Sequence, residues 1–203
     1  MRLHDNLESG NGYKVRLLLA QLGIPFERIE YDTTAGETRT PDFLQNVNAN
    51  GRIPVLELDD GKLLPESGAI LFYLAEGTPF LPEDRMGRAR VLQWMFFEQY
   101  SHEPYVAVAR AWVHVFDLDM TEERLQALEA KRKLGYDALD VMEEHLARND
   151  FFVGGRYTIA DIALYAYTHV AGEGGFDLER YSAVRAWISR VAEQPGYVPI
   201  TQG

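Results

Sequence analysis

Short apolar runs alternate with amphipathic stretches over the first 76 residues of the chain. Apolar positions from Val15 to Leu22 predict a helix that ends at Gly23, whereas alternating apolar and charged residues from Phe26 to Tyr31 predict a strand. A short helix over 41–47, two short strands around the turn at 59–61 and a helix over 66–75 follow. With a strand ahead of the first helix, the order β-α-β-α-β-β-α requires a mixed sheet covered by helices.

The pattern changes after residue 76. Residues 77–82 are rich in glycine and proline and are typical of a linker, and every later apolar pattern has helical period. We therefore predict an α/β domain over 1–76, a linker over 77–85 and an all-α domain over 86–203. The clearest local signal is Thr158 with Asp161, a helix capping box that we assign to stability and not to catalysis.

Composition and charge exclude several classes of function. The chain has 203 residues and a net charge of −11, spread over both predicted domains, which argues against a nucleic-acid partner. It contains no cysteine, which excludes a disulfide framework, a Cys-ligated metal and a thiol nucleophile supplied by the protein. No apolar run approaches the roughly 18 residues of a membrane span, so no membrane contact is predicted and a cytoplasmic location is expected.

Several familiar catalytic motifs are incomplete. Gly10-Asn11-Gly12 begins like a dinucleotide-binding loop, but the third glycine of that motif would fall at Val15. The pair His102-Glu103 would need a second histidine at Val106 to bind zinc as a zincin does. The five histidines are scattered singly along the chain, and no metal site is expected.

Three turn-like segments of the first domain share a property. Residues 9–14, 50–54 and 65–68 each expose backbone or hydroxyl donors at a strand end or at a helix start. Helix starts favour anions because their N–H groups lack partners within the helix. A proline at the edge of a sheet leaves neighbouring backbone groups able to pair with an extended peptide. The pattern favours a small, anionic, peptide-like ligand.

These segments resemble those of the glutathione transferase family. Arg52-Ile53-Pro54-Val55-Leu56 is similar to the family's strand entry with a cis-proline, and residues 65–70 are similar to its Glu-Ser motif. Residues 157–161 are similar to the capping box of its helical domain. The resemblance covers nearly the whole chain and implies a thioredoxin-like N-terminal domain, an all-α C-terminal domain, glutathione as co-substrate and a homodimer.

The resemblance also implies roles for single residues. Ile53, ahead of a cis Pro54, would pair through its main chain with the cysteinyl part of glutathione. Glu66 and Ser67 would hold the γ-glutamyl end. The remaining two cofactor-binding candidates, which would offset the negative charge of the tripeptide, are Arg52 and Lys14.

The catalytic candidates lie in the loop before the first helix. A free thiol has a pKa of about 8.5, and a hydroxyl or amide donor beside a helix start lowers that pKa. The Ser9 hydroxyl is the first choice for this donor and the Asn11 amide the second. Either residue could instead serve only as the N-cap of the helix, because both are favoured caps.

The second substrate is expected to be a small hydrophobic electrophile. Its candidate contacts, on the long helix after the linker, are Tyr100, His102, Tyr105 and Trp112. The leading hypothesis is a detoxifying glutathione transferase. Residues 9–14 also resemble the loop of nu-class bacterial members, which makes glutathione-dependent reduction of small disulfides an alternative. A non-catalytic binding or regulatory protein with this fold is the other alternative.

Overall fold

The chain folds into two compact units. The computed structural model describes residues 1–116 and 118–202, so Asp117 and Gly203, both within the predicted helical domain, lie outside the described residues. One unit comprises Met1–Glu76 together with the segment from Pro195 onward, and the other comprises Gly77–Gln194. The segment after the last helix therefore folds with the α/β unit, although the sequence pattern groups it with the helices.

A mixed sheet forms the centre of the first unit. It contains β1 (Arg2–Asp5), β2 (Glu27–Glu30), β3 (Val55–Glu57) and β4 (Leu63–Pro65), in the order β2-β1-β3-β4. β1 runs parallel to β2 and antiparallel to β3, and β3 and β4 are antiparallel. The predicted order of elements and the mixed sheet are confirmed.

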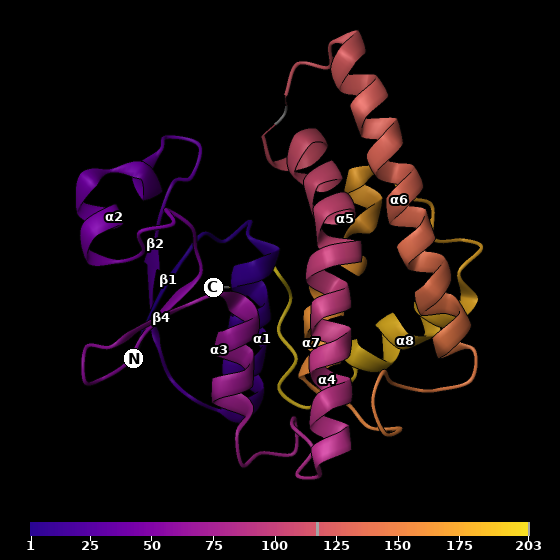
Figure 1. The fold of residues 1–203 in the computed structure, drawn as a ribbon, viewed down its shortest axis with the longest axis horizontal. Helices are drawn as coiled ribbons and strands as arrows, with labels where there is room; N and C mark the ends of the chain where they lie inside the picture. The colour runs from indigo at the N-terminus through magenta and orange to yellow at the C-terminus, as the bar shows by residue number, and fades with distance from the viewer. Residues whose placement is uncertain (117, 203) are drawn as a thin grey trace. The chain divides into compact units, whose positions relative to one another are not determined.

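Three α-helices pack on this sheet. α1 (Gly10–Leu22) and α3 (Ser67–Ala75) lie side by side on one face, and α2 (Pro41–Asn46) lies on the other, after a short 3-10 turn at Glu37–Arg39 (Figure 1). α1 begins five residues before the apolar run that predicts it, because the Ser9 side chain caps a first turn that contains two glycines. Gly23 ends the helix in the left-handed conformation, as predicted.

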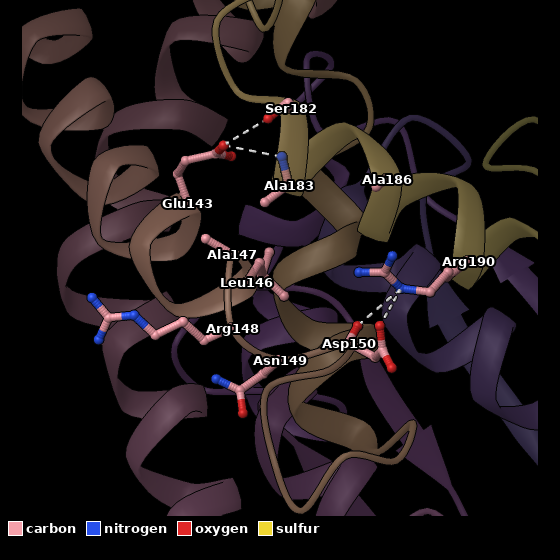
Figure 2. Close-up of a pocket in the computed structure, with 10 residues that line it drawn as sticks. All are labelled: Glu143, Leu146, Ala147, Arg148, Asn149, Asp150, Ser182, Ala183, Ala186 and Arg190. Carbon is pink, nitrogen blue, oxygen red and sulfur yellow. Dashed lines mark hydrogen bonds and ion pairs between the residues drawn. The ribbon is translucent and has the colours of Figure 1, made fainter.

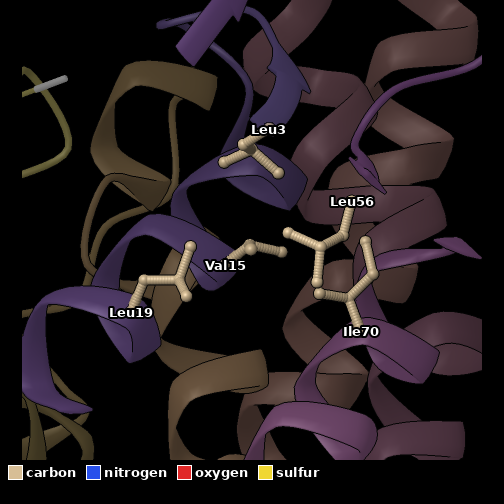
Figure 3. Packing of buried hydrophobic residues seen from close by; sticks show 5 residues of the cluster. All are labelled: Leu3, Val15, Leu19, Leu56 and Ile70. Atoms are coloured by element: carbon tan, nitrogen blue, oxygen red, sulfur yellow. The ribbon is translucent and has the colours of Figure 1, made fainter. Parts of the chain in front are cut away.

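The core of the first unit lies between the sheet and the helices α1 and α3. Its centre is a cluster of aliphatic side chains, none of which is exposed, contributed by Leu3, Val15, Leu19, Leu56 and Ile70 (Figure 3). Full burial of such a side chain stabilises a fold by about 1.5–3 kcal/mol. This core fixes the starts of α1 and α3, where the candidate residues lie.

The second unit is helical. Its helices are α4 (Arg85–Phe97), α5 (Glu103–Arg110), α6 (Glu122–Leu146), α7 (Ile159–Thr168) and α8 (Ser182–Ala192), with a 3-10 turn at Ala171–Gly174. The stretch predicted as one helix from residue 86 to 116 is interrupted by π-helical turns at Glu98–His102 and Ala111–Val115. Pro104 explains the first turn, because it has no N–H to donate to the carbonyl four residues earlier.

The capping box is present at the start of α7. Thr158 Oγ1 accepts from Ala160 N at 3.3 Å, and Asp161 Oδ2 accepts from Thr158 N at 2.9 Å. Asp161 Oδ1 also accepts from Trp187 Nε1 at 3.0 Å and from Phe152 N at 3.1 Å. Asp161 thereby joins α7, α8 and the segment before the cap through one fully buried carboxylate.

Just beyond α7, His169 gives the helical unit a pH dependence. Its ring stacks on Tyr165 at a centroid distance of 4.4 Å, and Nδ1 donates to the Tyr165 carbonyl at 2.7 Å. Burial lowers the pKa of His169 to about 4. The unfolded chain therefore binds a proton that the folded protein does not, and stability falls as the pH drops from about 6.5 toward 4.

We expect the free energy of unfolding to fall between pH 7 and pH 5 by about 1–2 kcal/mol more in the wild type than in His169→Gln. A glutamine side chain does not titrate, so the difference between the two proteins isolates the histidine. Urea unfolding at both pH values measures it. Equal losses in the two proteins would show that His169 has an ordinary pKa in the folded state.

Candidate functional site

Ser9 and Asn11 lie at the start of α1. Ser9 is the N-cap of the helix, and its Oγ accepts from Gly12 N at 3.1 Å. A hydroxyl can accept and donate at once, so this cap leaves the Ser9 proton available for a ligand. The two roles that the sequence leaves open for Ser9 are compatible in this geometry.

The orientation of the Asn11 amide is determined by its neighbours. Lys14 Nζ donates to Asn11 Oδ1 at 2.8 Å, and Ser67 Oγ donates to the same oxygen at 3.2 Å. An ammonium group can only donate, so the Asn11 atom that it meets is the oxygen, and Nδ2 must point elsewhere. The amide is thus held with its donor side turned away from Lys14 and Ser67.

Lys14 lies against Asn11. Its side chain is buried, 1% exposed, on the first turns of α1. Through Asn11 it connects the start of α1 to Ser67, the first residue of α3. The structure therefore places three of the predicted residues, from two helices, in one hydrogen-bonded group.

Gly12 allows β1 and α1 to approach closely. A Cβ atom added at Gly12 would lie 1.5 Å from Asp5 Oδ1, so any other residue would displace the end of β1. The carboxylate of Asp5 thus packs directly against the turn of α1 that carries Asn11. This contact with the end of β1 fixes the position of the loop at 9–14.

The segment before β3 has the backbone form that the resemblance implies. The Ile53–Pro54 peptide bond is cis. Ahead of it, Asn48 Nδ2 donates to the Arg52 carbonyl at 2.9 Å, and Gly51 has a φ of 63°, which favours glycine. The Arg52 side chain is exposed and Ile53 is half-buried, so both can reach a ligand along this edge.

The junction of β4 and α3 is strained. Glu66 has a φ of 75° and a ψ of 114°, and among the described residues it is the one residue other than glycine with a positive φ. Such a conformation costs about 1–3 kcal/mol and is concentrated at functional sites. It turns the exposed Glu66 outward and brings Ser67, 6% exposed, to the N-terminus of α3.

The four candidates for the electrophile contact, all in the helical unit, differ in accessibility. Tyr100 is 84% exposed, and Tyr105 and Trp112 are half-buried. His102 is fully buried, with Nε2 3.0 Å from Thr168 Oγ1, whose proton goes to the Leu164 carbonyl. His102 therefore supports the packing of α7, and this placement argues against contact with a substrate.

A hollow of about 450 Å³ lies elsewhere in the helical unit, between α6 and α8 (Figure 2). Two of its charged side chains are bonded to backbone groups of the hollow. Glu143 accepts from Ala183 N at 3.0 Å and Val184 N at 2.9 Å, which caps α8, and Arg190 donates to the Asp150 carbonyl at 3.1 Å. None of the predicted site residues lines this hollow.

Across residues 1–116 and 118–202, no cluster of three His, Asp or Glu side chains suits a metal ion. None of the helices there combines the length and apolar character that crossing a bilayer requires.

Family models match both units. The N-terminal domain model of glutathione S-transferases matches residues 1–76, and the C-terminal domain model matches residues 94–195. Among curated relatives, the "Disulfide-bond oxidoreductase YfcG" of Escherichia coli is 31% identical, over 91% of this chain and 87% of the relative.

Solved structures agree with the family models. A glutathione S-transferase from Pseudomonas fluorescens is 52% identical, with a TM-score of 0.95 over 99% of this chain and 98% of that one. A glutathione transferase of Phanerochaete chrysosporium, solved in complex with oxidized glutathione, is 28% identical, with a TM-score of 0.84 over 96% of this chain and 91% of that one.

Proposed function

Because this chain belongs to the glutathione S-transferase family, we propose that it binds glutathione and ionises its thiol for attack on a small hydrophobic electrophile. The observation that carries this proposal is the fixed amide of Asn11, whose donor side faces away from Lys14 and Ser67. A rigid donor at the start of a helix is suited to an anion such as a thiolate.

Thiol activation follows from the donors at the start of α1. Most of a thiol with a pKa of about 8.5 is protonated at neutral pH. Hydrogen bonds from Asn11 Nδ2 and the Ser9 hydroxyl would stabilise the thiolate, and the positive end of the helix dipole would add to them. The thiol belongs to glutathione, since the protein has no cysteine.

The rest of the tripeptide would be held by the two backbone segments. The Ile53 main chain, ahead of the cis peptide bond, would pair with the cysteinyl residue. The backbone N–H of Ser67 and the other N–H groups at the start of α3 would bind the γ-glutamyl carboxylate, with Glu66 near the amino group. Arg52 would supply the positive charge.

For the electrophile, we propose contacts from Tyr105 and Trp112, which are half-buried aromatic residues of the helical unit. Aromatic side chains offer flat apolar surface to a small hydrophobic substrate. The thiolate would displace a leaving group such as chloride, so that the carbon–sulfur bond forms as the carbon–chlorine bond breaks.

A second reaction, reduction of small disulfides, is favoured by the relative named as a disulfide-bond oxidoreductase. One glutathione thiolate would attack a sulfur of the disulfide and release a thiolate. A second glutathione would then attack the mixed disulfide, giving oxidised glutathione and the second thiol. This sequence needs no cysteine of the protein.

Initial rates with two model substrates separate these reactions. We expect turnover of glutathione with 1-chloro-2,4-dinitrobenzene if conjugation is the function, and with bis(2-hydroxyethyl) disulfide if reduction is. Asn11→Ala should slow whichever reaction occurs. Absence of both reactions, together with no binding of glutathione by calorimetry, would instead support a non-catalytic protein.

A further inference from the structure

Arg16 is a buried arginine in the middle of the apolar run of α1. Its side chain is 1% exposed. Nε lies 3.0 Å from Asp5 Oδ2, and Nη2 donates to the Leu7 carbonyl at 2.8 Å. Nη1 donates to the carbonyls of Ile200 and Gln202, at 2.9 and 2.7 Å. One planar guanidinium thus joins the end of β1, the loop before Ser9 and the segment after α8.

The segment after α8 follows α1 closely. Tyr13 donates its hydroxyl proton to the Val198 carbonyl at 2.7 Å. At Gly196 the backbones nearly touch, because an added Cβ would lie 2.9 Å from Gln21 Cα. Residues 196–202 therefore run along α1 from its last turn back to its first, and they end beside the loop that carries Ser9.

The loop from Asn6 to Ser9 is held from several sides. Ser9 N donates to the Asn6 carbonyl at 2.9 Å, and Asn6 Nδ2 donates to the Tyr31 carbonyl at 2.8 Å. Arg16 adds the contact to Leu7, two residues before Ser9. A shift of this carbonyl would move the helix cap, and with it the donors at the start of α1.

Burial of this arginine needs compensation. Removing a guanidinium from water costs several kcal/mol, and the cost is offset only where the charge is paired and its N–H groups are bonded. Two of the carbonyls that compensate Arg16 belong to residues 200 and 202. Loss of these contacts would leave Nη1 without its two acceptors, with only Asp5 and the Leu7 carbonyl still paired to the guanidinium.

We propose that Arg16 is a positioning residue for the thiol-activating loop, and that it couples this loop to the segment at residues 196–202. The inference rests on the proposed function. Because coupling between two sites is reciprocal, glutathione should order the segment, and loosening the segment should weaken activation of the thiol.

Two substitutions test the coupling in the full chain. Arg16→Lys keeps a positive charge beside Asp5. Its single ammonium group cannot reach both the Leu7 carbonyl and the carbonyls of residues 200 and 202, as the planar guanidinium does. Tyr13→Phe removes the hydrogen bond to Val198 and leaves the Arg16–Asp5 pair intact. Arg190→Lys, in the helical unit, is the matched control for an arginine that bonds a backbone carbonyl.

Hydrogen exchange should show slower exchange of residues 196–202 when glutathione is added to the wild type. The pKa of the bound glutathione thiol, read from ultraviolet thiolate absorbance, should rise by about 0.5–1 unit in Arg16→Lys and by less in Tyr13→Phe. The KM for glutathione should rise about 3–10-fold in Arg16→Lys, as expected for coupling of this size. Arg190→Lys should change neither quantity.

The outcomes separate the two proposals. If wild-type protein does not bind glutathione, the proposed function fails. If it binds and ionises glutathione, but both variants retain the wild-type thiol pKa and KM while exchange of 196–202 speeds up, then the segment has only a structural role and the coupling is wrong. A thermal melt of each variant identifies the temperature range in which it is folded.

Discussion

Asn11→Asp is expected to lower kcat/KM for glutathione-dependent turnover by about 100-fold or more, which is the usual cost of losing one preorganised donor at a developing charge. The carboxylate keeps an oxygen for Lys14 and Ser67, so the connection between α1 and α3 is retained. It replaces the Nδ2 donor with a negatively charged oxygen, which would raise the thiol pKa. Steady-state rates across a pH series measure both effects.

Two further variants separate the loss of the donor from the effect of the added charge and from nonspecific effects of mutation. Asn11→Ala removes the donor without adding charge, so its loss of rate should be smaller than that of Asn11→Asp. Asn46→Ala, which removes a side-chain bond to Asp42 on the surface of α2, serves as a control in the same unit. Wild-type rates in both Asn11 variants would mean that Asn11 does not contact the thiol, and would leave Ser9 as the activator.

Asp161→Ala is expected to reduce the free energy of unfolding by about 3–5 kcal/mol, because it leaves several buried donors without their acceptor. These donors are the backbone N–H groups of Phe152 and Thr158 and the indole N–H of Trp187. Urea unfolding followed by circular dichroism measures the loss.

Thr121→Ala provides the comparison. Thr121 caps α6 with one exposed hydrogen bond to Arg124 N at 3.3 Å, and its loss should cost about 1 kcal/mol. If Asp161→Ala costs no more than Thr121→Ala, the buried network around Asp161 contributes little beyond an ordinary cap. The folded Asp161→Ala protein should retain glutathione turnover, since we assign this residue to stability.

Periodicity and turn chemistry predicted most of the fold. Alternation marked β2, the capping box marked α7, and Gly23 marked the end of α1. The apolar pattern does not predict the first turn of α1, because Gly10 and Gly12 are poor helix formers. Gly12 is needed there for a tertiary contact, since only glycine leaves room for the Asp5 carboxylate. The helical period does not predict the two π-helical turns either, although Pro104 is a visible cause of the first.

The sequence predicts which segments form the site, but not the hydrogen bonds that connect them. Ser9, Asn11 and Ser67 were selected for their chemistry, whereas the contact of Lys14 with Asn11 depends on packing between two helices. The apolar pattern does not predict a role for Arg16, although a charged residue inside the apolar run from Val15 to Leu22 is a signal of one. Its partners at residues 200 and 202 are 184 and 186 positions away, and no local pattern links them.

Donors at the start of α1 are expected to ionise the thiol of bound glutathione. Titration of the ultraviolet thiolate absorbance of glutathione in complex with the wild type tests it directly. We predict that the bound thiol is half ionised at least one pH unit below the roughly 8.5 of a free thiol, and that Asn11→Asp reverses this shift. A bound thiol that titrates as it does in free solution would show that these donors do not ionise it.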